Sequence, residues 1–174
     1  MELKSIKTNK KNIVYTAVYN VGSDNVEATE ERKVICHELP KDSLGEALQN
    51  LNSTVIEVMG FVKDYREGMV VDGFSLSHTK NGTRSMEISF TKQLDNIGGK
   101  PHKLKTPFFR IDDPADGENG SVNIEAANVK ACKHAIHEAK SYAKGDRSQM
   151  TFKQYMQENG ALSSADSEGC LIEV

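Results

Sequence analysis

The sequence has no tryptophan, and aromatic residues make up only 6% of its 174 positions. So few large aromatic side chains predict a core of modest size. The three cysteines, Cys36, Cys132 and Cys170, show neither the C-x-x-C spacing of a zinc site nor a disulfide framework. We therefore expect three free thiols, with Cys132 buried.

Long apolar runs are also missing. No stretch approaches the roughly 20 residues that a helix needs to cross a bilayer, and the first residues lack the basic-then-apolar layout of a secretory signal. The apolar share of 37% and the charged share of 27% are typical of soluble globular proteins. These features favour a cytoplasmic protein without a membrane partner, and the length suits one domain.

Charge is distributed unevenly along the chain. Residues 1–111 hold 16 Lys and Arg against 14 Asp and Glu, a net charge of +2, whereas residues 112–174 hold 6 against 11, a net charge of −5. This division fits an anionic ligand on residues 1–111, the body, and an acidic tail that keeps weakly binding ligands away. Ordinary solvated charges on the surface would give the same totals. We predict one α+β domain over residues 1–150 and a flexible acidic tail over residues 151–174.

Alternating apolar and polar residues predict two strands early in the chain, at residues 13–21 and 32–38. We expect these strands to pair as a hairpin with a long loop. A Ser-x-x-Glu capping box at Ser43 and Glu46 then predicts the start of a helix, and Gly60 predicts its end.

The clearest local prediction is a hairpin within residues 69–93, because Asn-Gly at its centre supplies the positive φ angles of a tight turn. A Gly-Gly loop over residues 94–105 leads to a strand at 106–111. A long helix from Glu125 to Lys144 follows, with Gly145 as its C-cap. This order predicts an α+β fold with a single antiparallel sheet of about five strands, two main helices and a disordered acidic C-terminal tail.

No motif predicts catalysis, a cofactor or a metal ion. Cys36 and His37 are neighbours on a strand, so their side chains point to opposite faces and do not form a nucleophile and base pair. Cys132 has two histidines nearby on the same helix but no carboxylate. The acidic run 112–120 lacks the D-x-D-x-D-G order of a calcium loop, so a solvated loop is the favoured interpretation, and cation binding there stays open.

Basic residues surround two adjacent phenylalanines in the second half of the chain. Single-stranded nucleic acid is held by cations along its backbone and by aromatic faces on which its bases stack. Neighbours on a strand face opposite ways, so only one of Phe108 and Phe109 can stack while the other is core. A buried pair beside solvated lysines is the alternative. Including a basic stripe on the last helix, the candidate nucleic-acid-binding residues are Lys92, Lys100, Lys103, Lys105, Phe109, Arg110, Lys130 and Lys133.

Two segments resemble small uncharacterised phage and prophage proteins. One is VDGFSLSHTKNG at residues 71–82. The other is EAKSYAKGDRSQMTF at residues 138–152, which is similar to an ending close to E-A-x-x-Y-x-x-G-K-R-A-Q-x-x-L-F. The likeness covers residues 70–152 in patches, with Asp146 and Ser148 where Lys and Ala are common. This resemblance implies a role beside DNA recombination or replication, in the cytoplasm of a host cell.

The segment Gln149-Met150-Thr151-Phe152 is similar to the sliding-clamp-binding peptide of bacterial replication proteins, Q-L-[S/D]-L-F. In that peptide the glutamine and two apolar side chains fill a pocket. The resemblance therefore implies that Gln149, Met150 and Phe152 bind a partner protein. Lys153 stands where the peptide ends in Phe.

These patterns lead to two functional expectations. The first is a non-catalytic, phage-type accessory protein that binds single-stranded DNA or supports a replication or recombination complex, with a sliding clamp or another replication protein as candidate partner. The second is a protein-binding inhibitor or adaptor that acts on a host replication or defence protein. Binding that weakens steeply with salt favours the first, because neutralised phosphates release counterions. An exposed edge of a small antiparallel sheet also allows homo-oligomers.

Overall fold

The computed structural model describes residues 1–9, 11–22, 28–78, 83–93, 100–112, 124–148, 150–158 and 171–173. The strands are β1 (Glu2–Thr8), β2 (Ile13–Asn20), β3 (Thr29–Cys36), β4 (Met69–His78), β5 (Arg84–Gln93), β6 (Pro101–Lys105), β7 (Phe109–Arg110) and β8 (Leu171–Glu173). The helices are α1 (Asp42–Asn50), α2 (Asn52–Met59), α3 (Ala126–Ala143) and α4 (Phe152–Glu158), with a 3₁₀ turn, η1 (Lys63–Arg66). The fold is α+β with one antiparallel sheet, as the sequence predicts.

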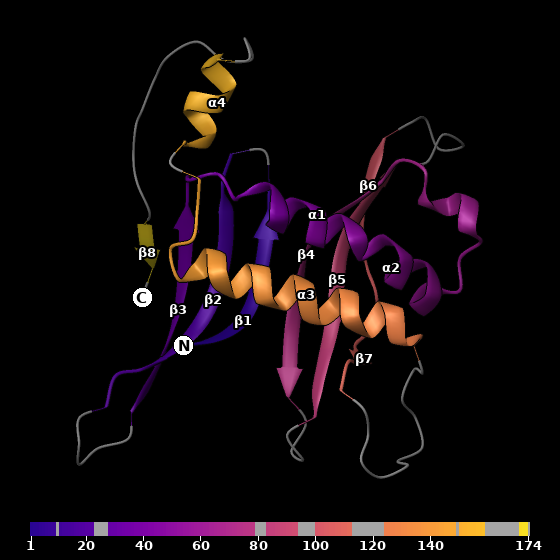
Figure 1. Ribbon diagram of the computed structural model, residues 1–174, viewed down its shortest axis with the longest axis horizontal. Coiled ribbons are helices and arrows are strands. Elements are labelled where there is room, and N and C mark those ends of the chain that lie inside the picture. Colours follow the sequence, from indigo (N-terminus) through magenta and orange to yellow (C-terminus); the bar gives the residue numbers. More distant parts are fainter. Residues whose placement is uncertain are drawn as a thin grey trace.

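The sheet consists of two meanders whose first strands pair with each other (Figure 1). Its strand order is β6-β5-β4-β1-β2-β3-β8, and β7 pairs with the far end of β5. One meander, β1 to β3, is followed by α1 and α2, and the other, β4 to β6, is followed by α3. The meanders join antiparallel, with Ser5 opposite Ser75 and Ile6 opposite Phe74. This arrangement puts β1 at the centre of the sheet.

A glycine allows β4 to approach β1 closely. The register of β4 against β5 shifts between Val71 and Gly73, which marks a β-bulge, and Gly73 has a φ of +156°. A Cβ atom at this position would lie 2.0 Å from the Ile6 carbonyl oxygen and 2.8 Å from the Lys7 Cα atom. Only glycine fits the junction of the two meanders in this conformation.

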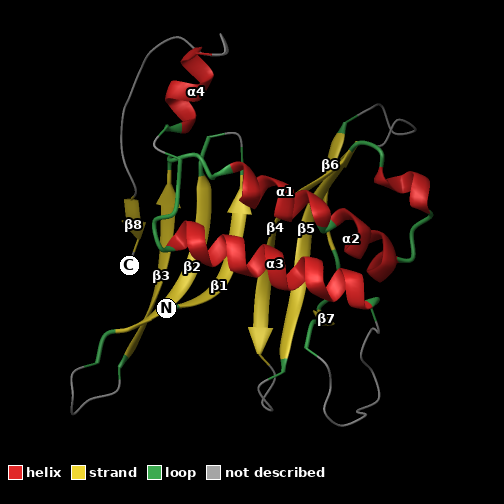
Figure 2. Ribbon diagram, in the orientation of Figure 1, coloured by secondary structure: helices red, strands yellow, loops and turns green. Residues whose placement is uncertain are grey.

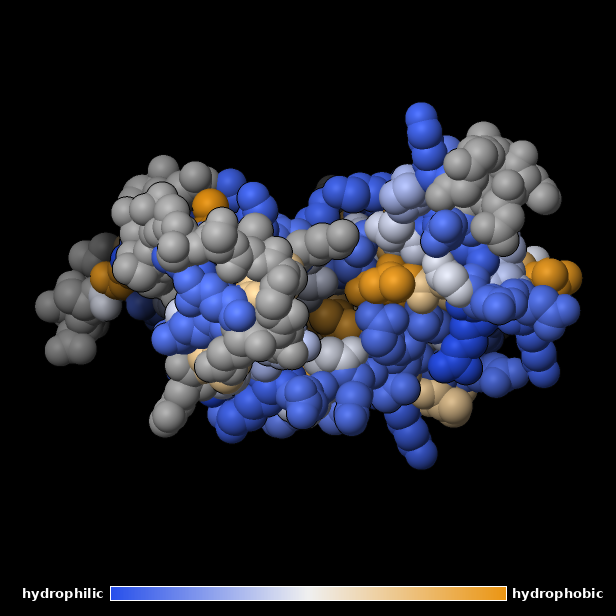
Figure 3. All heavy atoms as spheres, turned by 90° about the horizontal axis from the view of Figure 1, so that it is seen from above, coloured by the Kyte–Doolittle hydropathy of each residue, from blue (hydrophilic) through white to orange (hydrophobic). Residues whose placement is uncertain are grey.

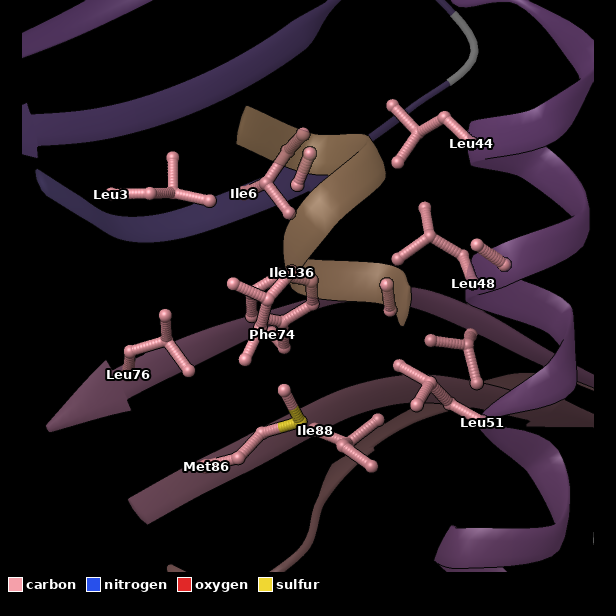
Figure 4. Close-up of a cluster of buried hydrophobic side chains, with 14 of the residues drawn as sticks. Leu3, Ile6, Leu44, Leu48, Leu51, Phe74, Leu76, Met86, Ile88 and Ile136 are labelled. Atoms are coloured by element: carbon pink, nitrogen blue, oxygen red, sulfur yellow. The ribbon is translucent and has the colours of Figure 1, made fainter. Parts of the chain in front are cut away.

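The core lies between one face of the sheet and the helices α1, α2 and α3, which lie across the strands (Figures 1 and 2). Figure 4 shows Leu44 and Leu48 of α1 and Ile136 of α3 around Phe74 and Ile88 of the sheet. All five side chains are at most 4% exposed. Burial of such apolar side chains is the main force that holds the two layers together.

None of the helices α1 to α3 lies on the opposite face of the sheet (Figure 2). We call this surface the open face. Along β5, Ile88 and Phe90 are buried, whereas Glu87 and Ser89, which alternate with them, are partly exposed. This alternation is typical of an antiparallel sheet with one face in solvent.

The sequence pattern does not predict β1. Leu3 and Ile6 both lie in the core although they are three residues apart, because the register of β1 shifts between Leu3 and Ser5. This irregularity breaks the period of two on which strand prediction depends. The structure also has β6 inside the expected Gly-Gly loop, and only residues 109–110 of the strand expected at 106–111 form β7.

The helix expected from Ser43 to Gly60 is two helices, which meet at Leu51. The helix α1 begins one residue before Ser43, and no side chain caps it, so the capping box with Glu46 is wrong. Ser43 already lies inside the first turn, where its hydroxyl is past the N-cap position. Gly60 ends α2 in the left-handed conformation, with a φ of 66°, as predicted. The helix α3 confirms the last predicted helix to within one residue at each end.

Regular structure is also described within the predicted acidic tail. The Thr151 amide donates to Gln154 Oε1 at 2.8 Å, and the Gln154 amide donates to Thr151 Oγ1 at 3.2 Å. This reciprocal capping box begins α4. The strand β8 adds to the edge of β3. Residues 159–170 and 174 lie outside the described residues, so the flexibility of the tail stays a prediction.

The cysteines differ from the expectation at one position. Cys132 is free and buried, as predicted. Cys36 is disulfide-bonded, so the expectation of a free thiol is wrong there. Spacing along the chain does not reveal a disulfide whose partners are brought together only by the fold. Cys170 lies outside the described residues.

Seen from above, the described surface is mostly hydrophilic, with hydrophobic side chains in small patches (Figure 3). Large apolar side chains that are at least half exposed include Val62, Val70 and Phe108. Among the described residues, no helix has the length and apolar character needed to cross a membrane.

Candidate nucleic-acid interface

Lys103 and Lys105 lie on the open face, at the β6 edge of the sheet. In the ladder between β5 and β6, Thr91 is opposite Lys103 and Ser89 is opposite Lys105. Phe90, between the two β5 residues, is buried in the core. Side chains alternate along a strand, so both lysines point away from the core, and both are exposed.

Arg110 of β7 extends this basic edge. It lies opposite Ser85 of β5, whereas its neighbour Phe109 lies opposite Met86 and faces the core. Alternation therefore puts Arg110 on the same face as the β6 lysines. Lys100, which immediately precedes β6, is exposed at the other end of the edge. We call Lys100, Lys103, Lys105 and Arg110 the basic edge.

Among the described residues, the Glu87 carboxylate partly neutralises the basic edge. Lys105 Nζ donates to Glu87 Oε1 at 2.7 Å, with the Lys105 side chain 60% exposed and the Glu87 side chain 17% exposed. An ion pair with one partner this exposed contributes about 0 to 1 kcal/mol. A phosphate group can therefore compete with Glu87 for the lysine.

The structure corrects the aromatic residue of the predicted site. Phe109 is 2% exposed, so its ring is core and offers no face to a base. Phe108 is 50% exposed. Only one of the two rings faces solvent, as predicted, and the exposed ring is that of Phe108.

Lys92 is also misplaced in the predicted set, because it lies on the core side of the sheet. It is 9% exposed, and its Nζ donates to the carbonyl oxygen of Glu67. The same Nζ lies 4.7 Å from the centroid of the Tyr65 ring, which packs against Phe61 with 4.1 Å between centroids. These contacts fasten η1 to the end of β5, so the Lys92 ammonium is not available to a nucleic-acid backbone.

Lys130 and Lys133 lie on the other side of the molecule from the basic edge. Both are exposed on α3, whereas Cys132 and Ile136 of the same helix are buried in the core. The helix covers the core face of the sheet (Figure 1), so its exposed lysines point away from the sheet. The predicted nucleic-acid-binding residues are therefore divided between two opposite surfaces.

The predicted partner-binding segment is paired with the body of the protein. The Leu39 amide donates to the Met150 carbonyl oxygen at 3.0 Å, and the Phe152 amide donates to the His37 carbonyl oxygen at 2.8 Å. Phe152 is partly buried and packs against the core. Gln149 lies outside the described residues. The apolar members of the motif are thus integrated into the fold.

Arg147 holds the start of this segment. Its Nε donates to the Tyr142 carbonyl oxygen at 3.0 Å, and its Nη1 donates to Glu38 Oε2 at 2.9 Å. The Nη2 atom donates to the Tyr15 hydroxyl at 3.4 Å. The guanidinium group also lies over the Tyr142 ring, 5.1 Å from its centroid. One side chain therefore connects α3, β2 and the segment that follows β3.

No group of three or more His, Cys, Asp and Glu side chains in the described part of the chain could hold a metal ion. Asp112, the first residue of the predicted acidic loop, accepts hydrogen bonds from Arg84 at 3.0 and 2.9 Å. These hydrogen bonds lower the pKa of the Asp112 carboxyl. The other acidic residues of that loop lie outside the described residues.

We expect the protein to lose stability at alkaline pH. Burial raises the pKa of the Cys132 thiol and of the Tyr15 hydroxyl to about 12, and it also raises the pKa of Tyr142. The folded protein holds these protons more tightly than the unfolded chain does. This stability is therefore fully present below about pH 9 and is lost as the pH rises toward about 12. Urea unfolding at a series of alkaline pH values checks this.

The variant Tyr15→Phe provides a control for the alkaline loss. Because it has no hydroxyl to ionise at position 15, its stability should fall less steeply above about pH 10 than that of the wild type. A free energy of unfolding that stays constant across the alkaline range would contradict the role of these buried groups.

No family model matches the chain, and it matches no curated protein and no solved structure. Its functional assignment therefore depends on its own geometry and chemistry.

Proposed function

We propose that the protein binds single-stranded DNA on the open face of its sheet, along the basic edge. The observation that supports this best is the position of Lys103, Lys105 and Arg110 on one face, with the exposed ring of Phe108 in the same stretch of chain. Cations of this kind hold backbone phosphates, and an exposed ring stacks on a base. Binding needs no catalytic group.

The hydroxyl groups beside the basic edge support the proposal. Ser85 and Ser89 lie directly opposite Arg110 and Lys105 in the ladders. Serine hydroxyls donate hydrogen bonds to phosphate oxygens. The hydroxyl of Thr91, which lies opposite Lys103, already donates to Asp72 Oδ2 at 2.7 Å. The face therefore offers a serine hydroxyl beside two of its basic residues. None of these groups is arranged to read base edges, so we expect little sequence preference.

The role that fits such binding is that of an accessory protein in DNA replication or recombination, which the resemblance to phage proteins also implies. A sliding clamp or another replication protein is a candidate partner through Met150 and Phe152. Because the Phe152 amide donates to the His37 carbonyl oxygen, this segment has to leave its place beside residues 37–39 before it can enter a pocket on another protein.

A protein-binding inhibitor or adaptor, acting on a host replication or defence protein, is the second candidate. The helix α4 stands clear of the sheet in Figure 1, and its Tyr155 is 47% exposed, which suits contact with another protein. Proline and lysine on an edge strand also protect it from pairing with other chains. In this alternative, Pro101 and the β6 lysines only prevent the edge of the sheet from pairing with other chains, and they bind no DNA.

Charge reversal on β6 tests the DNA proposal. We expect the double variant Lys103→Glu, Lys105→Glu to bind a fluorescent oligothymidylate about tenfold or more weakly at about 0.1 M salt. The slope of log affinity against log salt should become shallower by about 1.4, because each lost phosphate contact on a single strand removes about 0.7. Fluorescence anisotropy at several salt concentrations measures both quantities.

A matched control uses the opposite surface. The double variant Lys130→Glu, Lys133→Glu makes the same change in net charge with two exposed lysines of α3, and its affinity should stay close to that of the wild type. Equal weakening by both pairs would mean that net charge alone governs binding. Phe108→Ala should weaken binding without changing the melting temperature. If the wild type binds no oligonucleotide at low salt, the adaptor function is favoured.

A further inference from the structure

A row of directly opposite residues crosses the open face from β6 to β1, over strands that are neighbours in the sheet (Figure 1). Its members are Lys105 of β6, Ser89 of β5, Gly73 of β4 and Lys7 of β1. Residues directly opposite each other in a ladder lie on the same face. Lys7 is exposed, whereas Ile6 before it is buried in the core. The row therefore places a further cation, Lys7, on the same face as the basic edge.

The Lys7 ammonium has no hydrogen bond or ion pair with any residue that the structure describes. Other lysines of the open side are paired. Lys4 of the same strand donates to Glu2 at 2.8 Å, and Lys105 donates to Glu87 at 2.7 Å. A phosphate can therefore bind Lys7 without first displacing a carboxylate of the protein.

The side chains between Lys105 and Lys7 are small. Gly73 has none, and the hydroxyl of Ser89 is partly exposed. In the next row, Ser75 of β4 lies directly opposite Ser5 of β1. Within the described residues, no hydrogen bond uses the hydroxyls of these three serines. Glycine lets a ligand approach the backbone closely, and serine hydroxyls donate to phosphate oxygens. A DNA strand can therefore lie close to the sheet along this row.

Carboxylates flank the row at Asp72 of β4 and Glu87 of β5, and each already accepts a hydrogen bond from a neighbouring side chain. Asp72 Oδ2 accepts from the Thr91 hydroxyl at 2.7 Å, and Glu87 Oε1 accepts from Lys105 Nζ. The row itself contains no acidic residue from β6 to β1. Phosphates above it would meet a cation at each end and a hydroxyl between them.

We propose that the DNA strand continues from the basic edge across the sheet to β1, where Lys7 binds a phosphate. This inference rests on the proposed function. Lys105 and Lys7 are three strand spacings apart, about 14 Å. The charges of one strand of B-DNA are about 3.4 Å apart along its axis, so this span corresponds to about four nucleotides, and to fewer in a more extended strand. Beyond Lys7 the row continues with the apolar Val14 of β2, which ends the phosphate contacts at β1.

Lys7→Gln tests the crossing with an oligothymidylate of about 12 residues, a length within the site sizes of single-strand-binding folds. The slope of log affinity against log salt should become shallower by about 0.7, which corresponds to about fivefold weaker binding at about 0.1 M salt. Lys7→Arg should keep the wild-type slope, because it keeps the charge. The melting temperature should not change, since the side chain is exposed.

Lys130→Gln is the matched control, because it removes one charge from the opposite surface, and its affinity should stay close to that of the wild type. Fluorescence anisotropy measures the slopes, and titration at high concentration should give one oligonucleotide per protein. If Lys103→Glu, Lys105→Glu weakens binding but Lys7→Gln changes neither affinity nor slope, the strand keeps to the basic edge. That result overturns the crossing and leaves the proposed function intact. Equal weakening by Lys130→Gln, or two oligonucleotides per protein, also overturns the crossing. A wild type that binds no oligonucleotide overturns both.

Discussion

Replacing Gly73 by alanine should destabilise the protein by about 3 to 5 kcal/mol, although the change adds only one methyl group. The added Cβ would lie 2.0 Å from the Ile6 carbonyl oxygen, and the φ of +156° is one that L side chains rarely adopt. Steric overlap and backbone strain therefore act together at the junction of β1 and β4. Native domains are stable by only about 5 to 15 kcal/mol, so this loss should be visible as a large shift in urea unfolding.

Gly45→Ala is the matched control for this prediction. Gly45 lies in α1, and no heavy atom is within 4 Å of the position that its Cβ would occupy. Alanine at this site should stabilise the protein by about 0.5 to 1 kcal/mol, because it restricts the unfolded chain more than glycine does. The two glycine variants should thus shift stability in opposite directions. A Gly73→Ala protein as stable as the wild type would show that β1 and β4 do not approach as closely as described.

Replacing Arg147 by alanine should destabilise the protein by about 2 to 3 kcal/mol, because hydrogen bonds to charged groups are lost and buried acceptors are left unpaired. The Arg147 side chain is 15% exposed, and it donates to Tyr142, Glu38 and Tyr15. The loss should also be local. Amides at the docked segment, such as those of Leu39 and Phe152, should exchange hydrogen faster than in the wild type.

Arg147→Lys separates charge from geometry at this position. A lysine keeps the attraction to Glu38, but a single ammonium cannot reproduce the planar fork that contacts three groups at once. We expect an intermediate loss of stability and partial protection at Leu39. Hydrogen exchange followed by mass spectrometry, compared with amides in β1 and β4, shows whether the effect is confined to the segment after Gly145 and to residues 37–39, which pair with it. Uniformly faster exchange would contradict a local role.

The parts of the fold that the sequence predicts well are those with an unbroken period. The helix α3 is found within one residue of its predicted ends, the strands β2 and β5 follow clear alternation, and β4 does so after its irregularity at Gly73. The strand β1 is missed because its bulge after Leu3 interrupts the alternation. The capping box that begins α4, at Thr151 and Gln154, is visible in the sequence as T-x-x-Q. This pattern would have predicted a helix beyond residue 150.

The candidate site is only partly predictable for a different reason. Alternation along one strand indicates that Phe108 and Phe109 face opposite ways, but which of them is buried depends on the register of β7 against β5. In the same way, the sequence identifies Lys92 as a cation, but its burial depends on η1 folding back over the end of β5. Pairing between distant segments determines both outcomes, and no local pattern encodes it.

The central position of β1 has a consequence for how the protein is made. Thr8 of β1 donates to the carbonyl oxygen of Asp72 of β4, 64 residues further along the chain. At a synthesis rate of about 5 to 20 residues per second, β1 waits roughly 3 to 13 seconds on the ribosome before its second neighbour exists. During that interval the apolar side chains Leu3 and Ile6 lie on a strand with an unpaired edge, the kind of surface that nucleates aggregation. The yield of folded protein in a cell should therefore depend on how fast the stretch from β2 to β4 is translated and on whether a chaperone covers β1 until β4 arrives.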